Sequence, residues 1–163
     1  MDRSYTLAEY LKQNPGGTLE EIAAQYQTSL LEVVRRTPGC TVIEGTHFNK
    51  VWEQLSNWGK LTLVVNTGDV IFEYASAIPN GAHQRGYFNL QSHDGLSGHI
   101  KATACAAIAF VERKFMGLDT AVVIFLNLKG EAMLKIFLGR DKQRALLAHQ
   151  LTLFRTLPET LRQ

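Results

Sequence analysis

The sequence of 163 residues has few of the features that mark several common protein classes. It contains two cysteines, Cys40 and Cys105, and no CxxC pair, which excludes a disulfide scaffold and a cysteine-based zinc or iron–sulfur site. No apolar run reaches the roughly 18 residues of a membrane-spanning helix. No apolar segment of the signal-peptide kind follows the first residues. We therefore expect a cytoplasmic protein without membrane insertion.

An excess of charge of one sign is also absent. The chain carries 17 Lys and Arg against 15 Asp and Glu, a formal net charge of +2. This balance is not the basic footprint of a nucleic-acid or membrane-surface protein. Hydrophobic residues make up 45% of the chain, enough for a proper core, and the length predicts one domain over residues 1–163.

Residues 1–39 are predicted to form a helical N-terminal portion. Two capping boxes, Thr18 with Glu21 and Ser29 with Glu32, each precede apolar residues at helical spacing. An earlier helix is expected after Thr6. A fourth helix is expected after Thr46, with one apolar stripe that ends before Gly59: Phe48, Val51, Trp52, Leu55 and Trp58.

After Gly59 the hydrophobic pattern becomes that of strands, and the separators between them are short and turn-prone. Such short connections imply antiparallel neighbours. The strand 120–127 is apolar on both faces, so it should be central and covered on both sides. The predicted strands are 60–67, 69–75, 84–90, 96–102, 105–113, 120–127 and 131–138.

The C-terminal stretch from 141 to 157 again has helical spacing, with Asp141 as the expected cap and Pro158 as the limit. Gly139, just before it, is expected to need an unusual backbone angle. The predicted fold is therefore α+β: N-terminal helices, a large antiparallel β-sheet and a C-terminal helix. Residues 40–163 would hold the sheet and the helices packed on it.

The five histidines form neither HxH nor HExxH, so no zinc motif is predicted. His99 is distinctive because it lies on the polar face of a predicted strand that can form a hairpin with strand 84–90. Matching the polar faces sets Tyr87 opposite His99, Arg85 opposite Lys101 and Asn89 opposite Ser97. A shift of the register by one residue would turn the apolar residues of one strand to the polar face of the sheet.

A phenol, an imidazole and two cations would then share one sheet face. This face can be a plain solvated surface, as antiparallel sheets often have. It can also be a ligand site, because imidazole and phenolate both ligate iron and the cations could pair with carboxylates. No catalytic triad and no glycine-rich phosphate loop is visible, so no catalytic residue is predicted.

Several of these segments carry a resemblance. Gly86-Tyr87-Phe88-Asn89-Leu90 and Gly98-His99-Ile100-Lys101 resemble motifs of the haem-utilisation cytosolic carrier family (HutX/ChuX/HuvX type). The later motifs also resemble those of the haem-degrading HemS/ChuS proteins, which look like two such units in tandem. Further matching segments, which extend the resemblance over nearly the whole chain, are 18–21, 31–35, 115–117 and 135–141.

The resemblance implies a cytosolic, homodimeric protein that accepts imported haem and passes it to a haem-degrading enzyme. It also implicates the residues at Tyr87 and His99 in haem binding. Some relatives carry a further histidine at the position of Asn66, and asparagine is a poor iron ligand.

Residues opposite each other on a sheet point the same way, so they cannot easily grip both faces of one porphyrin. We expect either Tyr87 or His99 to ligate the iron, and Tyr87 first, because phenolate favours ferric iron. Arg85 and Lys101 are candidates for the haem propionates. The expected haem-binding set is Tyr87, His99, Arg85, Lys101 and His83.

Three other functions are weighed against the carrier. Residues 19–26 and 29–36 resemble a helix-turn-helix, but residues 18–36 carry a net charge of −1 from three Glu and two Arg, whereas DNA-reading helices are basic. A haem-degrading enzyme would need an external reductant, since no flavin or nicotinamide site is visible. A binder of another large hydrophobic anion would use the same donors and cations.

Overall fold

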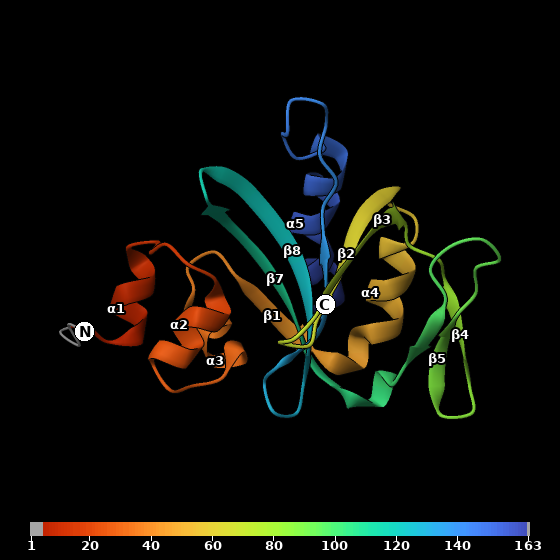
Figure 1. Ribbon diagram of the computed structural model, residues 1–163, viewed down its shortest axis with the longest axis horizontal. Coiled ribbons are helices and arrows are strands. Elements are labelled where there is room, and N and C mark those ends of the chain that lie inside the picture. Colours follow the sequence, from red (N-terminus) through yellow and green to blue (C-terminus); the bar gives the residue numbers. More distant parts are fainter. Residues whose placement is uncertain (1–4, 163) are drawn as a thin grey trace.

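The computed structural model describes residues 5–162 (Figure 1). Residues 1–4, on which the expected lack of a signal peptide partly depends, lie outside the described residues. The helices are α1 (Leu7–Lys12), α2 (Leu19–Gln25), α3 (Leu30–Arg36), α4 (Phe48–Leu55) and α5 (Ala148–Arg162), with 3₁₀ turns η1 (Gly45–His47) and η2 (Ala102–Ala104). The strands are β1 (Thr41–Glu44), β2 (Lys60–Asn66), β3 (Ile71–Ala77), β4 (Gly81–Gln84), β5 (Tyr87–Leu90), β6 (Gly98–Ile100), β7 (Cys105–Phe115), β8 (Leu118–Asn127) and β9 (Ala132–Phe137).

The fold is α+β, as predicted. Six antiparallel strands form the large sheet in the order β1-β7-β8-β9-β2-β3. Helices α1–α3 pack on one face of this sheet, and α4 and α5 pack on the other (Figure 1). The edge strand β3 exposes Ile71 and Phe72 to solvent.

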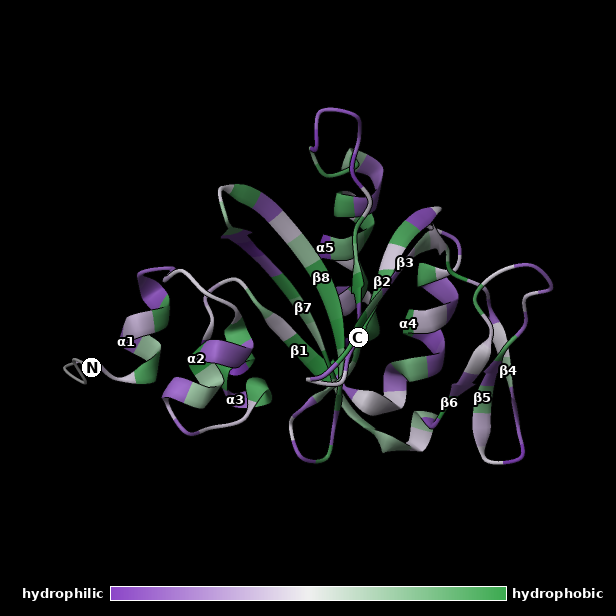
Figure 2. Ribbon diagram, in the orientation of Figure 1, coloured by the Kyte–Doolittle hydropathy of each residue, from purple (hydrophilic) through white to green (hydrophobic). Residues whose placement is uncertain are grey.

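Strand β8 is central and covered on both faces, which confirms the prediction for 120–127. Its alternate residues enter two different cores: Val123 and Phe125 pack with α4 and α5, whereas Ile124 and Leu126 pack with α1–α3. Figure 2 shows the resulting hydrophobic colour along both β7 and β8. A strand buried in this way has no polar face, so its sequence reads as one apolar run.

The N-terminal helices begin at the predicted caps. The capping boxes at Thr6 and Thr18 are complete, with both reciprocal hydrogen bonds. The box predicted at Ser29 is only half formed, because Glu32 pairs its carboxylate with Arg36 instead of the N-cap backbone.

Two helix boundaries differ from the prediction. Thr46 does not cap α4: it lies inside η1, and α4 follows from His47 without a side-chain cap. Helix α5 begins at Ala148 and continues through Pro158 to Arg162. The proline costs helix hydrogen bonding, but Leu157 and Pro158 are buried against the core, and this packing outweighs the local penalty.

Asp141 and Gly139 also have other roles than predicted. Asp141 accepts hydrogen bonds from the backbone of Gln143 and Ala145, so it orders the loop before α5 instead of capping the helix. Gly139 has no positive φ. Glycine is needed there because a Cβ would lie 2.6 Å from the carbonyl oxygen of Lys60.

A completely buried glutamine ties α5 to the large sheet. The side-chain oxygen of Gln150 accepts from the Gly139 backbone N–H at 2.7 Å. Its side-chain nitrogen donates to the carbonyl oxygens of Trp58 and Lys60 at 3.0 and 2.9 Å. All three partners are backbone groups close to the start of β2 and the end of β9, so one amide joins these two strands to the helix.

The structure contains a second sheet that was not predicted. It has three antiparallel strands in the order β4-β5-β6 and lies beyond α4, at the opposite side of the molecule from α1–α3 (Figure 1). Strands β1 and β4 were not predicted as strands of their own, and the strand predicted over 84–90 is wrong, because a turn at Arg85 and Gly86 divides it into the last residue of β4 and the whole of β5. Strands β1 and β4 have four residues each, and β4 carries no apolar alternation, so neither has a sequence signal of its own.

The three-stranded sheet docks on α4 through one aromatic face. Phe88 is 4% exposed, and its ring centroid lies 5.3 Å from that of Phe48 and 5.8 Å from that of Trp52. The Trp52 indole N–H donates to the carbonyl oxygen of Pro79 at 2.9 Å. This docking fixes which face of the small sheet is buried and which is open.

Candidate functional site

The open face of the three-stranded sheet carries Tyr87, Asn89 and His99. In the observed register Asn89 lies opposite His99, and Phe88 lies opposite Ile100. The predicted pairs of Tyr87 with His99 and of Asn89 with Ser97 are therefore wrong by two residues. The alternation of polar and apolar residues determines only which face of the sheet a residue occupies. A register shifted by two residues keeps the same residues on the polar face, so the alternation cannot distinguish the two registers.

Tyr87 and His99 are nevertheless neighbours. Their ring centroids are 6.0 Å apart at an interplanar angle of 65°, as expected for a diagonal pair on one sheet face. Tyr87 is 46% exposed, and His99 is also exposed. Two groups that can ligate iron thus stand side by side with access to solvent.

Asn89 occupies the centre of this open face. Its side-chain nitrogen donates to the carbonyl oxygens of Ala82, Gln84 and Tyr87 at 3.3, 3.0 and 3.1 Å. Its side-chain oxygen lies 2.5 Å from Nδ1 of His99. One half-buried amide therefore connects all three strands of the small sheet.

The two predicted cations lie at the ends of the face and not opposite each other, which corrects the predicted pairing of Arg85 with Lys101. Arg85 and Gly86 form the two-residue turn between β4 and β5, with φ of 55° and 83°, the left-handed geometry of a type I′ hairpin. Lys101 directly follows β6. Both side chains are exposed, and neither forms an ion pair within residues 5–162.

The structure does not bring His83 together with Tyr87 and His99. His83 pairs with Phe88 across β4 and β5, so it points to the opposite face of the small sheet. Its Nε2 lies 2.6 Å from the side-chain oxygen of Asn49 on α4, and its ring centroid lies 5.1 Å from that of Phe88. These contacts attach the small sheet to α4.

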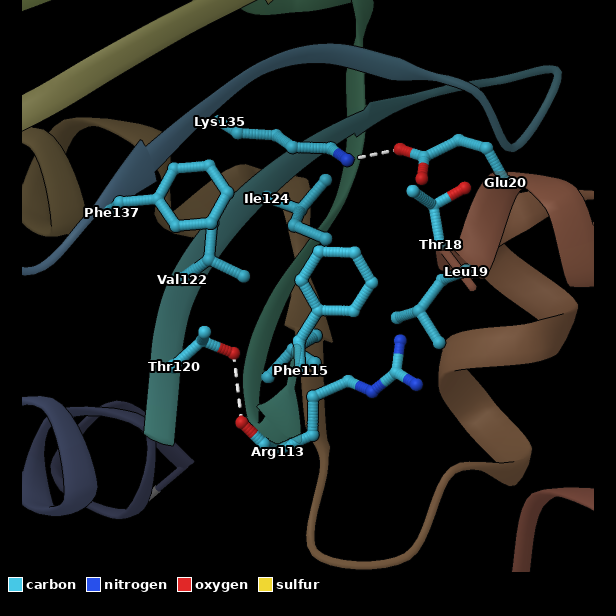
Figure 3. Close-up of a pocket in the computed structure, with 11 residues that line it drawn as sticks. Thr18, Leu19, Glu20, Arg113, Phe115, Thr120, Val122, Ile124, Lys135 and Phe137 are labelled. Atoms are coloured by element: carbon cyan, nitrogen blue, oxygen red, sulfur yellow. Dashed lines mark hydrogen bonds and ion pairs between the residues drawn. The ribbon is translucent and has the colours of Figure 1, made fainter. Parts of the chain in front are cut away.

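A separate cleft of about 130 Å³ lies between α2 and the large sheet (Figure 3). Its walls are mainly apolar and include Leu19, Phe115 and Phe137. Sequence reasoning did not identify this cleft, although Phe115 and Phe137 lie in segments that carry the family resemblance. The hydrophobic pattern around Phe115 and Phe137 did not indicate that α2 would lie over these two residues.

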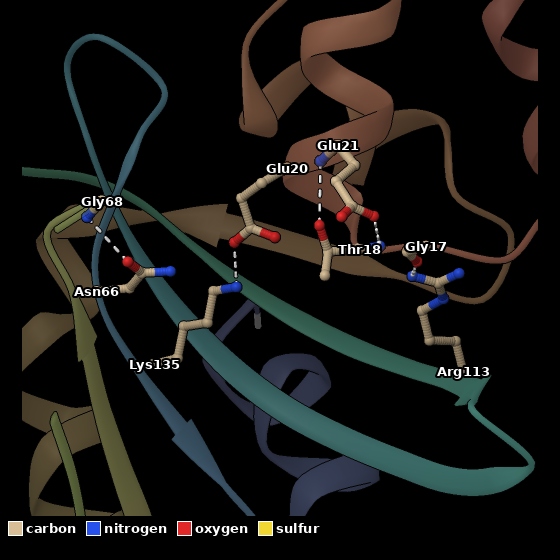
Figure 4. Close-up of polar contacts among 8 residues, drawn as sticks. All are labelled: Gly17, Thr18, Glu20, Glu21, Asn66, Gly68, Arg113 and Lys135. Carbon is tan, nitrogen blue, oxygen red and sulfur yellow. Dashed lines mark hydrogen bonds and ion pairs between the residues drawn. The ribbon is translucent and has the colours of Figure 1, made fainter. Parts of the chain in front are cut away.

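The cations of this cleft are already paired within the fold (Figure 4). Arg113 donates to the carbonyl oxygens of Pro15 and Gly17 at 2.8 and 3.2 Å, and burial lowers the pKa of its guanidinium. Lys135 forms an ion pair with Glu20 of α2. These contacts hold the N-terminal helices on the sheet.

Asn66 ends β2 in the large sheet, whereas Tyr87 and His99 belong to the three-stranded sheet. Its side-chain oxygen accepts from the Gly68 backbone N–H at 2.9 Å (Figure 4). This contact shapes the turn between β2 and β3, so the residue has a structural role here.

Burial disfavours both thiols as ligands. It raises the pKa of Cys40 and of Cys105 to about 11, and a cysteine must lose its proton to bind a metal. Within residues 5–162, no three His, Cys, Asp or Glu side chains form a group that could hold a metal ion. No helix in the same range is long and apolar enough to cross a membrane.

The chain resembles a family model and a curated protein. Residues 41–157 match the model described as haem utilisation ChuX/HutX. Over 160 residues the chain is 32% identical to the intracellular heme transport protein HutX of Vibrio cholerae serotype O1, covering 96% of this chain and 83% of that protein.

Solved structures agree with this match. The crystal structure of ChuX is 52% identical and superimposes with a TM-score of 0.94 over 97% of this chain and 99% of that one. Holo-PhuS, a heme-binding protein from Pseudomonas aeruginosa, shares the fold at 16% identity and a TM-score of 0.75, over 94% of this chain but 45% of that one. The family match and the identity over nearly the full length together show that the chain belongs to the haem-utilisation ChuX/HutX family.

Proposed function

We propose that this protein is a cytoplasmic haem carrier that binds haem on the open face of its three-stranded sheet and passes it to a haem-degrading enzyme. The observation that carries the proposal is the exposed pair of Tyr87 and His99, whose ring centroids are 6.0 Å apart. Membership of a family with a heme transport protein among its members supports it. A carrier role requires no catalytic residue.

The donor set of this face fits a ferric porphyrin. Phenolate and imidazole are both ligands of haem iron, and the exposed cations Arg85 and Lys101 are free to pair with the two propionates. His83 lies on the other face of the sheet and is not part of the proposed site.

Only one of the two rings should ligate the iron directly. Tyr87 and His99 stand on the same face of the sheet, so they cannot approach a flat porphyrin from both sides. We assign Tyr87 as the ligand of ferric haem, because the hard phenolate oxygen suits Fe(III), and His99 as the residue that assists. An open site of this kind also suits release of the cargo.

An absorbance titration with ferric haem tests this proposal. We expect a saturable Soret shift near one haem per chain. Tyr87→Phe should change the spectrum and weaken binding about tenfold, equivalent to the loss of about 1.4 kcal/mol. His99→Ala should weaken binding less.

His93→Ala is a matched control, because His93 is an exposed histidine in the loop between β5 and β6 and should not alter binding. An unchanged spectrum in Tyr87→Phe would assign the iron to another ligand. A wild-type titration no different from that of a non-binding protein would contradict the carrier function itself.

We further propose that the working unit is a homodimer. The proposed site is open on one side, and a second copy could supply the other wall. Sedimentation equilibrium should give about twice the 18.2 kDa of one chain. A single species of 18.2 kDa at micromolar concentration, with and without haem, would contradict the dimer.

A further inference from the structure

Asn89 has an amide whose orientation is imposed by its surroundings. Three backbone carbonyl oxygens, of Ala82, Gln84 and Tyr87, lie 3.0 to 3.3 Å from one end of the amide. A carbonyl oxygen can only accept a hydrogen bond, so the nitrogen must occupy this end. The amide oxygen is thereby directed across the strand pair towards β6.

This orientation determines where His99 carries its proton. The amide oxygen of Asn89 lies 2.5 Å from Nδ1 of His99 and can only accept, so Nδ1 must donate. A neutral imidazole has a single N–H, so Nε2 holds the free lone pair. Within residues 5–162, Nε2 of His99 has no hydrogen-bond partner, whereas Nε2 of His83 contacts Asn49.

We propose that Asn89 is a positioning residue that holds His99 in the Nδ1–H tautomer and presents Nε2 to the haem. Without this contact, the exposed imidazole would rotate and exchange between its two tautomers. Metal-binding histidines commonly donate the second ring N–H to an acceptor, which orients the ring and raises its basicity.

The role in haem binding rests on the proposed function, but the tautomer does not. The first measurement is therefore made on the protein without haem. In protein labelled with ¹⁵N-histidine, long-range ¹H–¹⁵N spectra should show a protonated Nδ1 and an unprotonated Nε2 for His99. In alkaline buffer, where imidazoles are neutral, a protonated Nε2 in the wild-type protein would overturn the assignment, and Asn89→Ala should remove the preference for the Nδ1–H form.

Asn89→Ala also deletes the three contacts with backbone carbonyls, so a second variant separates structure from positioning. Asn89→Asp retains an oxygen that accepts from Nδ1 of His99 but cannot donate to the carbonyls. In the same alkaline buffer, where the added carboxylate does not leave the ring as imidazolium, it should keep the Nδ1–H tautomer even if it destabilises the small sheet. If Asn89→Ala does not fold, the wild-type and Asn89→Asp spectra still decide the tautomer.

Haem titration then tests the functional half of the inference. Asn89→Ala should weaken haem binding by less than about tenfold and by no more than His99→Ala does, because Asn89 acts through His99 and His99 assists the ligand Tyr87. The double variant that combines Asn89→Ala with His99→Ala should bind haem no more weakly than the single variant His99→Ala, because Asn89 acts through His99. Additive losses, or unchanged affinity in Asn89→Ala, would overturn the positioning role. If wild-type protein binds no haem, the proposed function fails while the tautomer result stands.

Discussion

Phe88→Ala should lower the free energy of unfolding by about 3–5 kcal/mol, the usual cost of truncating a buried phenylalanine. Phe88 is 4% exposed and contacts the rings of Phe48 and Trp52 on α4. The cavity would open at the junction between the small sheet and the rest of the protein. In thermal unfolding the loss corresponds to a fall in Tm of roughly 10 °C for a chain of this length.

Phe72→Ala is the matched control for Phe88→Ala. Phe72 is 70% exposed on the edge strand β3, so the same truncation there should cost about 0.5 kcal/mol or less. Urea unfolding of both variants at one protein concentration measures the difference. Equal losses would mean that Phe88 does not dock the small sheet. We also expect Phe88→Ala to weaken haem binding, because β5 carries both Tyr87 and Asn89.

Gln150→Met should destabilise the protein by about 3 kcal/mol, since it removes three hydrogen bonds inside the core. Methionine has a similar length and shape, so the variant leaves the volume almost unchanged. The Gly139 N–H and the carbonyl oxygens of Trp58 and Lys60 would lose this partner, and the Trp58 carbonyl would keep only its 3.4 Å contact with Nε2 of His149. A buried donor or acceptor without a partner costs more than the bond itself contributed.

Gln54→Met makes the same chemical change on the exposed side of α4 and should alter stability by less than about 0.5 kcal/mol. The difference between the two variants in urea unfolding isolates the value of the buried amide. A stability of Gln150→Met equal to that of the wild type would show that water replaces all three contacts. Haem binding should remain in both variants at temperatures where they are folded, because α5 does not touch the small sheet's open face.

Sequence alone determined the face on which each proposed ligand lies but not its exact neighbour. Tyr87, Asn89 and His99 were placed on one polar face because side chains alternate along a strand. Their register depended on the seven-residue loop 91–97, whose length permits pairings two residues apart. The contact between Asn89 and His99 could not be found without that register, so the role of Asn89 had no signal in the pattern.

Features were predicted correctly where both partners of a contact lie close together in the sequence. The capping box at Thr18 was predictable because both of its hydrogen bonds are made within four residues. Strand β1 pairs with β7, far along the chain, and its four residues show too little of any period to be recognised. The predicted end of α5 at Pro158 was wrong because packing against the core, which is distant in the sequence, keeps the chain helical to Arg162.

The separation of the small sheet from the large one has a consequence for the release of cargo. Strands β4–β6 are joined to the rest of the chain by residues 78–80 on one side and 101–104 on the other, and they share no strand pairing with the six-stranded sheet. The buried residues Phe88 and Leu90 hold this sheet on the main core, and local opening of a segment breaks only that segment's own contacts. Opening of the sheet that carries the proposed ligands would therefore cost these docking contacts and leave the strand pairing of the large sheet intact. Local unfolding of the three-stranded sheet would offer a haem acceptor an intermediate in which the haem is bound less tightly and the rest of the carrier remains folded.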